Sequence, residues 1–255
     1  MTAASRVINT AKIAAHAPFV FRNWPYFLSS RFQDREGVLE LRNGLRFRLR
    51  PGSTDRASVS DVFILDTYKP VPSEAIVIDV GANIGAFTLC AAQRAKIVYA
   101  LEPVSDNFEA LRRNIELNGM TNISIHRLAM SGENGVTQIS VAGVASSIHF
   151  RTRGARLERV PTVTLESFMD GQRIAQVDYL KMDCEGAEWD ILLKTAPSVL
   201  SRIRHIELEF HNIGDETDPQ ILQEHLSSAG FQSTASRGKR FNGILVARRT
   251  GSPIQ

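Results

Sequence analysis

The stretch Val77-Ile78-Asp79-Val80-Gly81-Ala82-Asn83-Ile84-Gly85 decides the fold that the sequence predicts. It reads as a buried strand that ends near an acidic side chain, followed by a glycine-containing turn and a helix. A dinucleotide-binding fold would show G-x-G-x-x-G spacing here, but Asn83 and Ala86 stand where the second and third glycines belong. The D-x-G-x-x-x-G pattern suits instead a ligand with an amino-acid tail, whose carboxylate and ammonium both need partners.

Short apolar segments alternate with amphipathic ones on both sides of this stretch. Strands are expected at 76–80, 97–101, 123–128, 177–182 and 203–210, and helices at 85–94, 106–117 and 186–193. A closing hairpin at 231–235 and 244–248 brings the strands to seven. This alternation predicts an α/β fold with a doubly wound, mostly parallel, seven-stranded sheet.

The chain divides into three expected parts. Residues 1–35 form a basic, aromatic N-terminal extension, residues 36–70 a hairpin and a helix, and residues 71–255 the α/β domain. The hairpin turns at Asn43-Gly44, a pair that tolerates positive φ, and the helix is expected at 57–68. The extension either packs on its own domain or on a second subunit, or it contacts a partner or a membrane surface. The less regular stretch 135–163 is expected to be an insertion over the active-site edge of the sheet.

Composition excludes several classes of protein. Cys90 and Cys184 are the only cysteines, which is too few for a disulfide framework, so a cytoplasmic location is expected. No stretch approaches the about 20 apolar residues that a membrane-spanning helix needs, so no transmembrane segment is expected. The net charge of +3 is too small to indicate nucleic acid as a partner.

A second motif, Val98-Tyr99-Ala100-Leu101-Glu102-Pro103, places an acidic side chain at the end of the next strand. Glu102 follows Asp79 by 23 residues, and a carboxylate there can accept hydrogen bonds from both ribose hydroxyls of a nucleoside. Together the two motifs indicate a ligand that joins an adenosyl group to an amino-acid tail.

Two further strand ends carry groups suited to catalysis. In Asp178-Tyr179-Leu180-Lys181-Met182-Asp183-Cys184-Glu185-Gly186-Ala187-Glu188, the strand delivers Asp183 and Glu185 to the cleft. Glu188 serves either the cleft or the N-terminus of the following helix. His211 ends the strand Ile206-Glu207-Leu208-Glu209-Phe210-His211, where a neutral imidazole could take a proton from a hydroxyl; the alternative is a solvent-facing loop histidine.

The motifs VIDVGANIG, ALEP, NFEALRRNIELNG, TLESF, DYLKMDCEGAE and LEFH resemble the FkbM family of methyltransferases over residues 55–210. The resemblance implies a Rossmann-like class I methyltransferase fold and S-adenosyl-L-methionine as the cofactor. It also implies O-methylation of a hydroxyl on a natural product, a sugar or a glycan.

The resemblance also assigns site residues. Asp79, Gly81, Asn83 and Gly85 are expected near the methionine moiety, Glu102 at the ribose, and Asp183 near the transferred methyl group. The adenine side is expected to comprise Pro103 and Val104 with a loop after the third strand, formed by Ala129, Met130 and Ser131. The expected catalytic residues are Asp183, His211 and Glu185.

Several alternatives remain open from the sequence. The methyl group could go to nitrogen, or the domain could bind an adenosyl ligand without catalysis. A nucleic-acid methyltransferase is opposed by the modest charge and by the lack of an Asn/Asp-Pro-Pro-aromatic motif. Asp183 with Glu209 or His211 could hold Mg²⁺, but no spacing demands it and no metal is expected. The expected partner is a small-molecule or glycan acceptor, and a homo-oligomer is compatible with the sequence.

Overall fold

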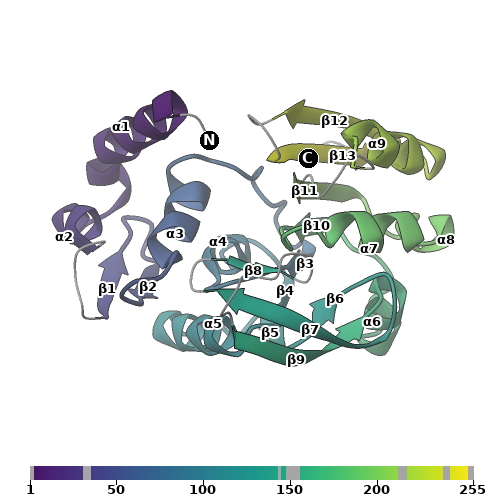
Figure 1. The fold of residues 1–255 in the computed structure, drawn as a ribbon, viewed down its shortest axis with the longest axis horizontal. Coiled ribbons are helices and arrows are strands. Elements are labelled where there is room, and N and C mark those ends of the chain that lie inside the picture. Colours follow the sequence, from purple (N-terminus) through teal and green to yellow (C-terminus); the bar gives the residue numbers. More distant parts are fainter. Residues whose placement is uncertain are drawn as a thin grey trace.

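A computed structural model describes residues 3–30, 36–142, 145–147, 156–211, 217–237 and 242–251. The chain begins with two helices, a hairpin and a third helix (Figure 1): α1 (Ala3–Val20), α2 (Trp24–Ser29), β1 (Gly37–Glu40), β2 (Arg46–Leu49) and α3 (Asp55–Phe63). The third helix is shorter than the expected 57–68, because the chain turns away and Asp66 adopts a left-handed φ of 57°.

The main sheet has the order β12-β13-β11-β10-β3-β4-β5. Its strands are β3 (Ile76–Val80), β4 (Ile97–Leu101), β5 (Ile123–His126), β10 (Tyr179–Met182), β11 (His205–His211), β12 (Phe231–Arg237) and β13 (Asn242–Arg249). Numbered along the chain within the sheet, this order is 3-2-1-4-5-7-6, and β13 runs antiparallel to both of its neighbours. Apart from the inserted antiparallel strand, it is the dinucleotide-fold order. The predicted doubly wound, mostly parallel, seven-stranded class I methyltransferase fold is confirmed.

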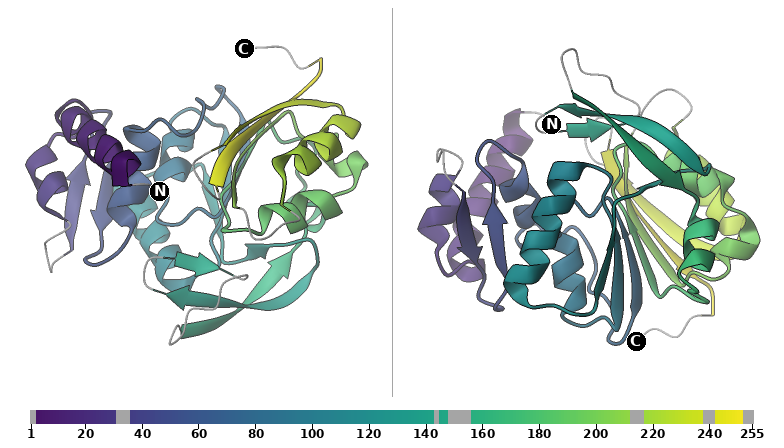
Figure 2. Two further views of the ribbon diagram at one scale, coloured as in Figure 1. Left: turned by 45° about the horizontal axis from the view of Figure 1, so that its top comes forward. Right: turned by 90° about the horizontal axis from the view of Figure 1, so that it is seen from below.

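Helices cover both faces of this sheet (Figure 2, right). On one face Val77 and Tyr179 pack against Phe87 and Ala91 of α4 (Ala86–Ala92). On the other face Ile78 and Leu180 share a core with the remaining helices. These are α6 (Leu165–Gly171), α7 (Glu188–Lys194), α8 (Pro197–Leu200) and α9 (Pro219–Ser228), while α5 (Ser105–Asn118) lies with α4. Because alternate residues of a strand point to opposite faces, an apolar strand of this kind needs cover on both.

The N-terminal helices pack onto the domain through a few aromatic side chains. Phe21, Phe27 and Phe47 are fully buried, and the Phe21 and Phe27 ring centroids lie 4.3 Å apart. Their cluster includes Ile84 of the glycine-containing turn that follows β3. The extension is thus connected by packing to the segment that leads into α4. Among the described residues, none of the helices has the length and apolarity needed to cross a bilayer.

A smaller second sheet has the order β6-β9-β7-β8. Its strands are β6 (Ala129–Met130), β7 (Gly135–Ala142), β8 (Ala145–Ser147) and β9 (Arg156–Val163). The expected loop at 129–131 is therefore partly a strand, because Ala129 and Met130 pair in parallel with Thr162 and Val163. This sheet is the expected insertion, and Ile139 and Val141 of β7 line the large cavity of the molecule.

Candidate active site

A cavity of about 890 Å³ opens at the carboxyl ends of β3, β4 and β10. Open α/β sheets bind ligands at this edge, and the volume is that of a small-molecule site. The structure brings together nine of the residues singled out from the sequence, which line this cavity: Gly81, Asn83, Glu102, Pro103, Val104, Ala129, Met130, Asp183 and Glu185. The other four, Asp79, Gly85, Ser131 and His211, do not line it.

The turn after β3 allows two strand ends to approach each other closely. Gly81 has a φ of +79°, and a Cβ there would lie 1.9 Å from the backbone oxygen of Asp183. A Cβ at Gly85, which has a φ of +92°, would lie 2.6 Å from a Leu111 methyl group. Both glycines are therefore required by contacts within the chain. Ser131 donates to Asp190 instead of facing the cavity.

Asp79 is fully buried in an ion pair below the cavity. Its Oδ1 lies 3.0 Å from Lys181 Nζ, and its Oδ2 accepts a hydrogen bond from the Thr88 hydroxyl at 2.5 Å. The strand register sets Lys181 directly beside Asp79. Lys181 also donates to the Gly81 carbonyl at 3.0 Å, so this pair ties the β3 turn to β10. A lysine in an otherwise apolar central strand was the sequence signal for such a pair.

Glu102 and Asn83 face each other across the turn. The Glu102 carboxylate accepts the backbone N–H groups of Asn83 at 2.8 Å and Val104 at 3.0 Å. Burial raises the pKa of Glu102 to about 7, although those two N–H groups act in the opposite direction. The Asn83 side-chain oxygen is buried and has no hydrogen-bond partner among the described residues. It is an acceptor beside the cavity that a ligand donor would satisfy.

These features fit S-adenosylmethionine. The carboxylate of Glu102 retains lone pairs for ribose hydroxyls, and the free Asn83 oxygen suits an N–H or O–H donor. On the second-sheet side, Val104 and Ala129 form one apolar cluster with Ile139 and Val160. An apolar slot beside a hydroxyl-binding carboxylate matches an adenine base joined to a ribose.

The opposite side of the cavity is built by residues that precede β3. The Tyr68 hydroxyl donates to Asp183 Oδ2 at 3.2 Å, and the Tyr68 ring packs edge-on against Phe87. Asp61 also lines the cavity, and burial together with the charge of Asp183 raises its pKa to about 6. Glu209 of β11 lines the same region. Sequence reasoning missed Asp61 and Tyr68, because no motif marks them.

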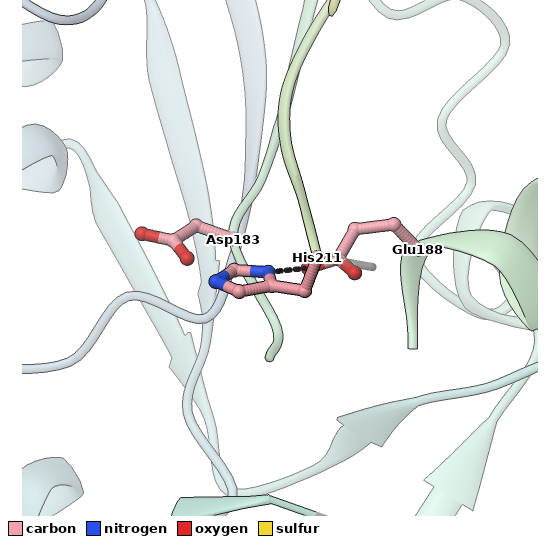
Figure 3. Close-up of side chains that lie close together, drawn as sticks. All are labelled: Asp183, Glu188 and His211. Atoms are coloured by element: carbon pink, nitrogen blue, oxygen red, sulfur yellow. Dashed lines mark ion pairs between the residues drawn. The ribbon is translucent and has the colours of Figure 1, made fainter. Parts of the chain in front are cut away.

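His211 lies between Asp183 and Glu188 (Figure 3) and does not line the cavity. Its Nδ1 is 3.4 Å from Glu188 Oε1, and its Nε2 is 3.6 Å from Glu185 Oε2. Burial alone would lower the pKa of His211, but Glu188, Glu185 and Asp183 outweigh it and raise the pKa to about 9. The sequence-based expectation of a neutral imidazole near pH 7 does not account for these three carboxylates.

Asp183, Glu188 and His211 each offer one ligand atom within 4.8 Å of the others, so they could hold a metal ion. Both Glu188 oxygens, however, already accept backbone N–H groups, from Cys184 at 2.7 Å and Gly186 at 2.9 Å. The imidazole would also have to lose its proton before it could bind a cation. His211 is therefore within ion-pair distance of Glu188 and Glu185 in the described structure, and Asp183 lies beside them.

Comparison with known families matches residues 79–233 to the methyltransferase FkbM domain. Methyltransferase 1 of Beauveria bassiana is 24% identical over 204 residues, which cover 69% of this chain and 81% of that protein. The 31-O-demethyl-FK506 methyltransferase FkbM of Streptomyces tacrolimicus is 27% identical over 213 residues, with 69% and 81% coverage.

Two matches involve proteins much longer than the matched region. AMB antimetabolite synthetase AmbE of Pseudomonas aeruginosa is 24% identical over 68% of this chain, which spans 10% of its length. The crystal structure of methyltransferase FkbM from Methylobacillus flagellatus superposes with a TM-score of 0.49 and 19% identity, over 74% of this chain and 47% of that one. The family match covers more than half of the chain, and the protein therefore belongs to the FkbM family of S-adenosylmethionine-dependent methyltransferases.

Proposed function

We propose that the protein methylates a hydroxyl group of a small molecule, namely a natural product, a sugar or a glycan. The observation that carries this proposal is the carboxylate of Asp183, which lines the cavity and accepts a hydrogen bond from Tyr68. In this proposal the Asp183 carboxylate accepts the proton of the hydroxyl. The name of the Streptomyces tacrolimicus relative, which refers to a 31-O-demethyl substrate, supports a hydroxyl as the acceptor group.

The strand-edge residues hold the cofactor in this proposal. The Glu102 carboxylate would accept hydrogen bonds from the ribose hydroxyls. The Asn83 side-chain oxygen would accept a hydrogen bond from the amino-acid tail, and Gly81 forms the turn beside Asn83. Pro103, Val104, Ala129 and Met130 surround the adenine. Asp79 acts indirectly, because its ion pair with Lys181 holds the turn in place. The bound sulfonium supplies the methyl group.

Asp183 would take the proton of the acceptor hydroxyl, and the bound cofactor would give up its sulfonium methyl group to that oxygen and leave as S-adenosylhomocysteine. Tyr68 orients this carboxylate through its hydrogen bond, and Asp61, Glu185 and Glu209 complete the acceptor side. Holding the two reactants in line supplies much of the rate, worth up to about 7–11 kcal/mol. His211, whose pKa is raised to about 9, pairs with Glu185 and Glu188, and in this proposal it does not act as the base.

The test is transfer of an isotopically labelled methyl group from the cofactor into cell extracts, followed by mass and NMR analysis of the labelled product. We expect an O-methyl product, and Asp183→Asn should lower turnover by about 10²–10⁴-fold, the usual contribution of a general base. Asp170→Asn is the matched control, because its side chain is 60% exposed on α6. An N-methyl product would contradict the hydroxyl assignment, and full turnover by Asp183→Asn would contradict its role.

A further inference from the structure

The helices α1 and α2 use only part of their surface to pack on the domain. Ala17, Phe21 and Phe27 are fully buried against the hairpin. Along α1, in contrast, the side chains of Ala11, Lys12, Ala14, Ala15, His16 and Phe19 are all exposed. The two helices lie at the end of the molecule away from α8 and α9 (Figure 1).

Two large aromatic side chains of this segment are exposed. Phe19 is 78% exposed and Trp24 is 38% exposed, whereas large aromatic side chains usually bury most of their surface in a folded protein. The other large hydrophobic residues exposed in the described structure are aliphatic and lie on four separate elements: Val136, Leu157, Leu193 and Ile221. Single exposed aliphatic residues are ordinary, whereas two exposed aromatic rings within six consecutive residues mark a surface that something covers.

The charge of the same segment is entirely positive. Residues 1–33 contain no aspartate or glutamate, and they contain Arg6, Lys12, Arg22 and Arg31. These positive charges exceed the net charge of +3 of the whole chain, so the excess is concentrated at this end. Lys12 and Arg22 are exposed, and no carboxylate of the described residues lies within ion-pair distance of either. The surface therefore complements an anionic partner.

We propose that the exposed side chains of this segment, Lys12, Ala15, Phe19, Arg22 and Trp24, dock onto an anionic lipid membrane. Tryptophan and phenylalanine rings lie favourably at the level of lipid headgroups, where an apolar ring and a wet surface meet. Lysine and arginine beside them gain from the negative potential of the membrane, within a Debye length of its surface. A second copy of the chain fits less well, because a twofold interface would bring the same positive charges face to face.

The experiment is co-sedimentation of the full chain with vesicles, either of phosphatidylcholine alone or of phosphatidylcholine mixed with phosphatidylglycerol. We expect binding to the mixed vesicles only, and its loss at high salt. Arg22→Glu should weaken binding by about tenfold or more, since each basic residue near the surface contributes roughly a factor of five. The double variant Phe19→Ser/Trp24→Ser should also weaken it, and both sites are exposed, so the fold should survive.

Matched controls carry the same chemical changes elsewhere. Lys96→Glu reverses an exposed charge at the start of β4, and Ile221→Ser removes an exposed apolar side chain from α9. Both should bind vesicles like the unaltered protein. Equal sedimentation with the two kinds of vesicle would overturn the proposal, as would loss of binding in the controls to the same extent. A dimer that dissociates in Phe19→Ser/Trp24→Ser, without vesicle binding, would assign the surface to a second copy instead.

Discussion

The cavity has two walls of different origin. The strand-edge wall comprises Gly81, Asn83 and Glu102 with the end of β10, and it lies inside the family match at 79–233. The N-terminal wall, formed by residues 50–68 and including Asp61 and Tyr68, precedes that match. Topology determines the first wall, because parallel strands end at one edge. Packing of a hairpin and a helix on the turn determines the second.

This difference between the two walls indicates which of them recognises the cofactor and which recognises the acceptor. A shared cofactor requires the same turn and carboxylates, so these follow motifs that can be read in the sequence. An acceptor that differs between enzymes is recognised by residues with no fixed motif. We infer that the strand-edge wall binds the cofactor and that the N-terminal wall selects the acceptor.

Removing residues 1–35 should give the largest effect, because it tests the support of the N-terminal wall. The truncation deletes Phe21 and Phe27, which are fully buried. Truncating one buried phenylalanine costs about 3–5 kcal/mol, so the loss of both should exceed that range. Denaturant unfolding measures it. Cofactor affinity of the folded fraction should persist, since residues 3–30 do not line the cavity; an unchanged free energy of unfolding would contradict the packing described.

Lys181→Met tests the ion pair with Asp79, which supports the strand-edge wall. It leaves the buried Asp79 carboxylate without its cation, which typically costs about 3–5 kcal/mol of stability. The double variant Asp79→Asn/Lys181→Met removes both charges and should recover part of the loss. The free energy of unfolding of the wild type, the single variants and the double variant gives the coupling energy. Additive effects would show that the two residues do not form an interacting pair.

The pKa of His211 depends on the carboxylates beside it, Glu188, Glu185 and Asp183. NMR titration of its ring should give a midpoint near pH 9 in the native protein, and Glu188→Gln should move the midpoint toward lower pH. Because the folded pKa lies above the ordinary value of 6.5, this group's stabilisation is full below about pH 6.5 and is lost as the pH rises through about 9. His225→Gln, on α9, is the control and should leave the His211 midpoint unchanged.

Much of the sheet was predictable from the sequence, because most of its strands are apolar runs, and β3, β4 and β10 are followed directly by Gly81, Glu102 and Asp183. The cavity positions of Glu102, Asp183 and Glu185 followed from the rule that strand ends meet at one edge. The role of Asp79 did not follow. Its neighbour in the sheet is Lys181, about 100 residues away in the chain, and only the register shows that pairing.

The N-terminal wall could not be predicted from the sequence, and the reason is similar. Asp61 and Tyr68 reach the cavity through the packing of α3 and the following segment against Phe87, which no local periodicity encodes. The second sheet was only partly predictable, because β6 and β8 are only two and three residues long. The high pKa of His211 likewise depends on Glu188 and Glu185, which approach it only in the folded chain.

The most direct test of the two-wall account is calorimetric titration of S-adenosylmethionine into the wild type, Glu102→Ala and Tyr68→Phe. The wild type should bind one molecule per chain, and Glu102→Ala should weaken binding by about 1–3 kcal/mol, the cost of losing hydrogen bonds to a charged group. Tyr68→Phe should leave the affinity nearly unchanged, because Tyr68 lies on the acceptor side. Equal weakening by both variants, or none by Glu102→Ala, would contradict the assignment of the cofactor to the strand-edge wall.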